Sequence, residues 1–237
     1  MQASIQPDFT WSKNHIFAGG AQNIVLLVEW RGAPSAEQGR RKNHKIAARE
    51  IELRLWLEPH IVLTRMYGCR ALSVSGDDNR SVLLPLGKIQ TGQRKYIALE
   101  FALKPAHAGK HDAVWLHWQF KQPYGEKICE LPMQKLSLEY SHHTGVLQES
   151  CCFHVEKHLE LLRTEEVLEQ ADLLSSKGKL GEGLELVRRH ADKLLLLAVR
   201  TGDRLLTREA ESLYRRCALT PPLNKLIEEQ DIRTGCI

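Results

Sequence analysis

Two histidines at helical spacing are the residues best suited to binding a metal ion. His154 and His158 occur in the segment HVEKH, four residues apart. On a helix they would share one face, where their imidazole nitrogens could chelate Zn²⁺. A zinc-protease pattern needs a glutamate directly after the first histidine, and Val155 occupies that position. Because no third ligand is signalled nearby, we expect a solvated or half-packed pair and predict no metal site.

A second group of titratable residues, His111, Asp112 and His117, lies on or beside one expected strand. Asp112 and His117 differ by an odd number, so they face opposite sides of a regular strand. His111 and His117 share a side, but a histidine pair without a nucleophile is not a catalytic constellation.

Glycine-rich segments also lack the context that phosphate binding requires. Residues 87–92 (GKIQTG) lie between two expected strands, and residues 181–183 (GEG) follow a helix. A phosphate loop instead joins a strand to a helix N-terminus. The sequence also has no GxSxG elbow and no Cys-His signature of a known thiol enzyme. We therefore predict no catalytic residue, no cofactor and no enzymatic activity.

Composition is that of an ordinary globular protein. The chain has 237 residues, 43% of them hydrophobic, and a formal net charge of +4. Residues 1–10 are polar rather than signal-like, and no apolar run is long enough to cross a membrane. The six cysteines form no CxxC pair, although Cys151 and Cys152 are adjacent. We expect a cytoplasmic protein with reduced thiols and no membrane contact.

A polar, basic segment over residues 32–45 interrupts the apolar patterns. It has no apolar face to bury, so we expect an exposed and mobile surface loop. The alternative is an anion or nucleic-acid patch formed by Arg40, Arg41, Lys42 and Lys45. No aromatic residue is interleaved with these charges, which favours the loop over nucleic-acid binding.

The first 140 residues consist of short apolar segments separated by turn-forming residues. Residues 49–57 (REIELRLWL) alternate between apolar and polar side chains, which is typical of a half-buried strand. No helical segment intervenes, as a parallel sheet would require. We predict an α+β protein whose residues 1–140 form an antiparallel β-sandwich of about seven or eight strands. The expected strands cover residues 23–30, 49–57, 61–67, 80–86, 95–103, 113–120 and 127–138.

Residues 145–237 follow a helical rhythm and predict three or four helices. The expected helices begin at about residues 149, 180, 204 and 223, and Asp203 is a candidate N-cap. Helices of this length need tertiary packing to be stable in water. The clearest buried face belongs to the second helix and comprises Leu180, Leu184, Val187, Ala191, Leu194 and Ala198. The third is expected to bury Leu206, Ala210, Leu213 and Cys217.

Large apolar side chains outside these buried faces are candidates for partner binding. Trp56 lies opposite the aliphatic residues of its strand, and Trp115 and Trp118 differ by three, so at least one of them leaves the core. The second helix also has more apolar positions than one narrow face needs. We predict that the helices dock on the sandwich through one of these tryptophans, or that the remaining face forms a homodimer or a partner site. The candidates are Trp56, Trp115, Trp118, Leu195 and Leu196.

Several segments match one known family. Residues 17–34 (FAGGAQNIVLLVEWRGAP) are similar to the segment before the von Willebrand factor A (vWA) domain in bacterial vWA-containing proteins. Residues 53–68 and 82–103 resemble the sandwich that follows that domain, and residues 155–216 resemble the helical region at its C-terminal side. The connection between two sandwich strands is matched by Pro85, Leu86, Gly87, Ile89 and Gly92.

The chain departs from this family where the vWA domain would lie. Only the loop over residues 32–45 occupies that place, so the resemblance implies that the domain is missing. The metal-binding Asp-x-Ser-x-Ser motif is also absent, because residues 172–176 (DLLSS) have the wrong spacing. The resemblance therefore implies a non-catalytic interaction or scaffolding module. Alternatives are a metal- or nucleotide-dependent hydrolase with an unrecognised site, or a weak nucleic-acid binder that uses the basic loop.

Overall fold

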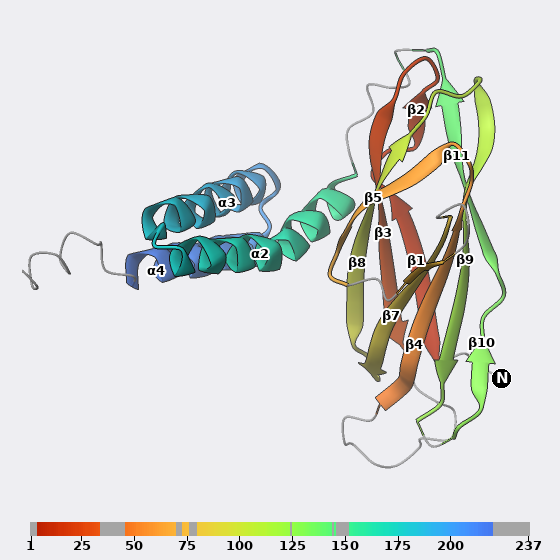
Figure 1. Ribbon diagram of the computed structural model, residues 1–237, viewed down its shortest axis with the longest axis horizontal. Helices are drawn as coiled ribbons and strands as arrows, with labels where there is room; N and C mark the ends of the chain where they lie inside the picture. The colour runs from red at the N-terminus through yellow and green to blue at the C-terminus, as the bar shows by residue number, and fades with distance from the viewer. Residues whose placement is uncertain are drawn as a thin grey trace, which may run out of the picture. The chain divides into compact units, whose positions relative to one another are not determined.

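The computed structural model describes residues 4–33, 46–69, 73–75, 80–123, 125–143, 145 and 152–219. The chain divides into two compact units, Met1–Leu159 and Glu160–Ile237. The first unit contains the strands and the first turns of helix α2, and the second contains the rest of α2 and the other helices (Figure 1).

The first unit is built from two β-sheets. One has four antiparallel strands in the order β1-β3-β8-β5. The other has seven strands in the order β2-β11-β9-β4-β7-β6, with β10 paired to β9. The strands of the first sheet are β1 (Ile5–Trp11), β3 (Gln22–Gly32), β5 (Ile61–Tyr67) and β8 (Arg94–Leu103). Those of the second are β2 (His15–Phe17), β4 (Ile46–Leu57), β6 (Ser73–Ser75), β7 (Ser81–Gln90), β9 (Gly109–Lys121), β10 (Ile128–Glu130) and β11 (Gln134–Ser141).

The predicted fold class, a strand-rich part followed by helices, is confirmed, but the described residues hold more strands than expected. β1 and β2 lie in a segment too polar to predict, and β2 pairs with β11 in parallel, whereas the other ladders are antiparallel. β1 is an edge strand and therefore tolerates Pro7. The strand expected over residues 127–138 is two strands, β10 and β11, because Pro132 between them has no amide proton for a ladder.

The core of the sandwich follows the alternation of its strands. In β4, Ile51, Leu53, Leu55 and Leu57 are buried while Trp56 is half-buried, as the period-2 pattern predicts. The first strongly apolar run is β3, which lies between β1 and β8 in the interior of its sheet. Its Trp30 packs against Trp118 of β9, with the ring centroids 5.9 Å apart.

Gly32 fixes the end of β3 against the turn between β7 and β8. Its amide donates to the Gln93 carbonyl (3.0 Å) and its carbonyl accepts from the Gly92 amide (2.8 Å). A Cβ atom at this position would lie 2.2 Å from the carbonyl oxygen of Gln90, so only glycine fits. Gly32 and Ala33 are buried, so the exposed loop predicted from residue 32 is wrong at its start. The rest of that predicted loop, residues 34–45, lies outside the described residues.

The helices are α2 (Phe153–Ser176), α3 (Leu180–Thr201) and α4 (Arg204–Leu219). α3 buries Val187, Ala191, Leu194 and Ala198 of the predicted face, whereas Leu180 and Leu184 are only half-buried. Its C-cap is Gly202, whose φ of 69° is left-handed and favours glycine. Asp203 caps α4 as predicted, because its Oδ1 accepts hydrogen bonds from the amides of Leu205 (2.9 Å) and Leu206 (3.3 Å).

Two helix predictions need comment. α4 buries Leu206, Ala210 and Leu213, but Cys217 is only half-buried. The fourth predicted helix, over residues 223–230, lies outside the described residues.

Candidate functional site

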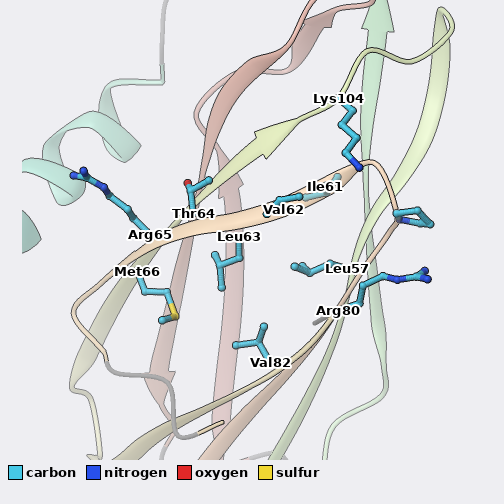
Figure 2. A pocket seen from close by; sticks show the side chains of 11 residues that line it. Leu57, Ile61, Val62, Leu63, Thr64, Arg65, Met66, Arg80, Val82 and Lys104 are labelled. Carbon is cyan, nitrogen blue, oxygen red and sulfur yellow. The ribbon is translucent and has the colours of Figure 1, made fainter. Parts of the chain in front are cut away.

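A pocket of about 680 Å³ opens beside β5, at one edge of the four-stranded sheet (Figure 2). Figure 2 shows Leu57, Leu63 and Val82 pointing into the same space. Leu57 belongs to β4 and Val82 to β7, so the pocket is lined by strands of both sheets. We call it the β5 groove. It is lined by Leu57, Pro59, Ile61, Val62, Leu63, Thr64, Arg65, Met66, Arg80, Val82 and Lys104.

A β-bulge in β5 gives the groove its shape. Ile61 is buried, Val62 is exposed and Leu63 is half-buried, as in a regular strand. The pairing of β5 with β8 then shifts between Leu63 and Arg65, and two consecutive residues, Thr64 and Arg65, are exposed. A bulge turns an edge strand and re-aims its side chains. The half-buried Leu63 and Met66 therefore offer apolar surface within the groove instead of filling the core completely.

The rim of the groove is cationic. Arg65, Arg80 and Lys104 are the charged residues of the lining, and it contains no carboxylate. The neighbouring carboxylate of Glu58 accepts a hydrogen bond from Trp115 Nε1 (3.1 Å), and that of Glu100 accepts one from the Tyr67 hydroxyl (3.2 Å). The lining itself is therefore cationic, with carboxylates in the residues next to it.

The lining of the groove is mainly aliphatic and cationic. Its lining holds neither a histidine nor a cysteine, and its hydroxyl belongs to Thr64. That hydroxyl donates to the backbone carbonyl of Glu100 (2.9 Å). The lining also has no carboxylate that could serve as a base for this hydroxyl.

The three predicted tryptophans separate into two environments. Trp118 is fully buried in the core, where it also approaches Phe9 (6.4 Å between ring centroids). It therefore cannot reach a partner, and its place among the partner-binding candidates is corrected. Trp56 and Trp115 face each other across the β4–β9 ladder and are half-buried on the outer face of the seven-stranded sheet.

Trp115 is already engaged within its own sheet. Lys135 Nζ lies 4.9 Å from the centre of its ring, and the same ammonium is 2.6 Å from Asp112 Oδ2. Together with the hydrogen bond to Glu58, these contacts cover the indole and satisfy its N–H. Trp56 in turn lies beside His117, 6.4 Å between ring centroids. Both tryptophans therefore have contacts within their own sheet, and their role in partner binding stays a prediction.

His154 and His158 do lie together, with ring centroids 4.7 Å apart. Each also has a partner in the first unit. His158 stacks on Tyr96 at 3.8 Å, and His154 Nε2 lies 3.5 Å from Glu29 Oε2. Within the described residues, no group of three or more histidine, cysteine, aspartate or glutamate side chains is arranged to hold a metal ion.

The remaining sequence candidates fall into three settings. Leu195 is half-buried and Leu196 is 72% exposed on α3. Cys152 is half-buried, whereas Cys151 lies outside the described residues. Burial raises the pKa of another thiol, Cys69, to about 11, which makes it a poor nucleophile at neutral pH.

The β5 groove was not predicted from the sequence. Residues 61–67 (IVLTRMY) indicate a strand, but nothing in them shows that the strand lies at an edge. In the sequence, the adjacent polar residues Thr64 and Arg65 interrupt the alternation of apolar and polar side chains. They are the local sign of the bulge, where both are exposed.

Comparison with known proteins yields structural likeness only. No family model matches the chain, and no curated protein matches its sequence. The ArnB paralog VWA2 from Sulfolobus acidocaldarius has a similar structure, with a TM-score of 0.53 at 8% identity over 88% of this chain and 93% of that one. A von Willebrand factor type A protein from Catenulispora acidiphila has a TM-score of 0.48 at 15% identity over 66% of this chain, which spans 37% of its length.

The likeness to VWA2 shows a shared fold, so the predicted relationship to vWA-containing proteins is supported at that level. A major pilin, SpaD from Corynebacterium diphtheriae, is more distant, with a TM-score of 0.37 at 12% identity over 57% of this chain and 34% of that one.

Among the described residues, no helix combines the length and apolarity needed to span a membrane.

Proposed function

We propose that this chain is a non-catalytic protein-interaction module whose binding site is the β5 groove. The observation that carries the proposal is the lining of that groove. Aliphatic side chains of two sheets form its floor, three cationic residues surround it, and its lining contains no histidine, cysteine or carboxylate. Such a site recognises a ligand by shape and charge.

The resemblance to vWA-containing proteins gives this module a context. The proposal takes the chain as an accessory part without the vWA domain and its metal-binding motif, as the resemblance implies, so that it would contribute to assembly instead of metal-dependent adhesion. A cytoplasmic location is part of the same proposal. The fold it shares with VWA2 is compatible with this role and does not identify a partner.

Site-specific photo-crosslinking in the native cell tests the proposal. A crosslinking amino acid at Val62, which is 48% exposed in the groove, should capture a defined protein. Ile128 is the matched control, since it is 57% exposed in the same unit but does not line the groove. Equal labelling from both positions, or no protein adduct from Val62, would contradict the proposal.

A further inference from the structure

We infer that the β5 groove loses its ligand at mildly acidic pH, because protonation of His60 displaces the turn that forms one end of the groove. This inference rests on the proposed function and adds the regulation of that site. It follows from the position of His60 in the turn, from the rings that hold its imidazole, and from the surroundings that a proton on this imidazole would meet.

His60 lies in the turn between β4 and β5, and its two chain neighbours line the groove. Pro59 and Ile61 both belong to the lining. The turn is tight, because the Ile61 amide donates to the Glu58 carbonyl (3.0 Å). The His60 carbonyl also accepts a hydrogen bond from the amide of Lys104 (2.9 Å), another residue of the lining (Figure 2). A displacement of His60 would therefore move residues at this end of the groove.

The imidazole of His60 packs in a cluster of three rings, which we call the ring cluster. Its centre lies 6.1 Å from that of His111 in β9 and 6.1 Å from that of Tyr140 in β11. The ring centres of His111 and Tyr140 are 5.2 Å apart, and these two rings meet edge to face. The ring cluster therefore joins the turn to two strands of the seven-stranded sheet.

The ring cluster suits a neutral imidazole better than a charged one. Within the described residues, the buried His60 Nε2 and the buried Tyr140 hydroxyl have no hydrogen-bond partner, so no hydrogen bond joins the two. A neutral imidazole can carry its proton on Nδ1 and leave Nε2 as a bare acceptor. Protonation would place a charged N–H donor at this buried nitrogen, where it loses hydration without gaining a partner. Burial raises the pKa of Tyr140, so the phenol stays neutral and supplies no negative charge.

The charged groups around His60 do not compensate for the added proton. Burial lowers the pKa of His60 below its ordinary 6.5, and His111 lowers it further, whereas Glu58 raises it. The Glu58 carboxylate already accepts a hydrogen bond from Trp115 Nε1 (3.1 Å). Lys104 places a further cation at this end of the groove.

The sign of this effect sets the pH range in which the switch acts. In the unfolded chain His60 takes up a proton near its ordinary pKa of 6.5, whereas the folded ring cluster resists that proton. The docked turn is therefore favoured above about pH 6.5 and is progressively destabilised as the pH falls below that value. A protonated imidazole gains hydration by leaving the ring cluster, and the turn moves with it.

Nuclear magnetic resonance of the full chain measures the switch without a ligand. The His60 imidazole should titrate with a midpoint below that of the exposed His142, and the amides of residues 61–63 should shift with the same midpoint. His60→Gln should abolish these amide shifts. His111→Gln should move the His60 midpoint upward, because it removes a neighbouring group that carries positive charge at low pH. The control His143→Gln changes an exposed histidine outside the ring cluster and should alter neither titration.

Two results of this titration would overturn the inference. A His60 that titrates while the amides of residues 61–63 stay unmoved would show that the ring turns into solvent without displacing the turn. A His60 midpoint at or above that of His142 would show that the ring cluster does not resist the proton.

Photo-crosslinking from Val62 connects the switch to the proposed function. In extracts of the native cell, the adduct yield should be about threefold or more lower at about pH 5.8 than at about pH 7.5, and His60→Gln should remove this difference. A yield that is independent of pH, or one that falls equally in His60→Gln, would overturn the inference and leave the proposed function standing. Amides that titrate as expected without an adduct at either pH would instead contradict the proposed function, and the loss of ligand with it, while the movement of the turn would stand.

Discussion

At the scale of single residues, position within the pleat of a strand separates similar side chains. Trp115 and Trp118 lie on the same strand, β9, three residues apart. Trp118 packs in the core against Trp30 and Phe9, whereas Trp115 is covered from outside by Lys135. The two residues are therefore equivalent in type and different in energetic role.

This difference predicts unequal losses of stability. Trp118→Ala should lower the free energy of unfolding of the sandwich by about 3–5 kcal/mol, since it leaves a large cavity between the sheets. Trp115→Ala should cost about 1 kcal/mol, because the lost contacts are half-exposed. Urea titrations followed by far-UV circular dichroism provide the comparison. Similar losses for the two variants would mean that the outer face is as tightly packed as the core.

A buried histidine in the helical unit is the second residue with a specific role. His190 Nε2 lies 3.0 Å from Thr164 Oγ1. Burial lowers the pKa of His190 below its ordinary 6.5, and the nearby cations Lys193 and Arg163 lower it further, against the opposing effect of Glu160. The folded helices therefore favour the neutral imidazole.

The sign of this shift predicts a pH dependence. Below about pH 6.5 the unfolded chain binds a proton that folded His190 resists, so stability should fall as the pH is lowered from about 7.5 to about 5. His190→Gln should reduce the loss, because it removes the titrating group while keeping a hydrogen-bonding side chain. Thermal unfolding of the helical unit at several pH values measures this. A variant with an unchanged pH slope would show that another group is responsible.

At the scale of elements, close backbone approach decides where a glycine is required. In α3, a Cβ atom on Gly183 would lie 2.8 Å from the carbonyl oxygen of Ala171 in α2. A Cβ atom on Gly181, two positions earlier in the same helix, would meet nothing within 4 Å. The backbones of α2 and α3 are therefore in close contact at Gly183, whereas Gly181 has space for a side chain.

Alanine at these two positions should act in opposite directions. Gly183→Ala should destabilise the helical unit by about 1–3 kcal/mol, because the helices must move apart. Gly181→Ala should stabilise it by about 0.5–1 kcal/mol through the higher helix propensity of alanine. Calorimetry of both variants beside the wild type separates the effects. A neutral Gly183→Ala would imply that α2 and α3 adjust at little cost.

At the scale of the whole molecule, the exposed apolar positions of α3 raise the question of association. Leu194 is fully buried, whereas Leu196 and Val199 are exposed in the described structure. Docking of the helices through a tryptophan and the use of this face for a homodimer or a partner were predicted as alternatives, and both stay predictions.

Substitution at these positions tests the association directly. We expect Leu196→Glu to change stability by less than about 0.5 kcal/mol and to leave the mass in solution unchanged. Leu194→Ala should cost about 2–5 kcal/mol, because it opens a cavity in the helical unit. Light scattering at several protein concentrations reports the mass. A wild-type dimer that Leu196→Glu dissociates would instead assign a homodimer to this face.

Local patterns in the sequence were sufficient for much of the fold. The alternation in residues 49–57 predicted the buried face of β4, and the spacing of Val187, Ala191 and Leu194 predicted that of α3. Asp203 was recognisable as a cap from its position between two helical patterns. These features depend on residues within one or two turns of each other, so the sequence alone determined them.

The candidate site depended on contacts between distant segments. That β5 lies at an edge follows from which strands pair, and the groove forms only because Leu57 and Val82 of the other sheet lie opposite it. Likewise, Gly32 is constrained by Gln90, far along the chain. Periodicity shows which face of a strand is apolar, but it does not show which neighbour covers that face. Only the tertiary structure decided this, because strand pairing is governed by the total burial and hydrogen bonding of the sandwich and not by any one segment.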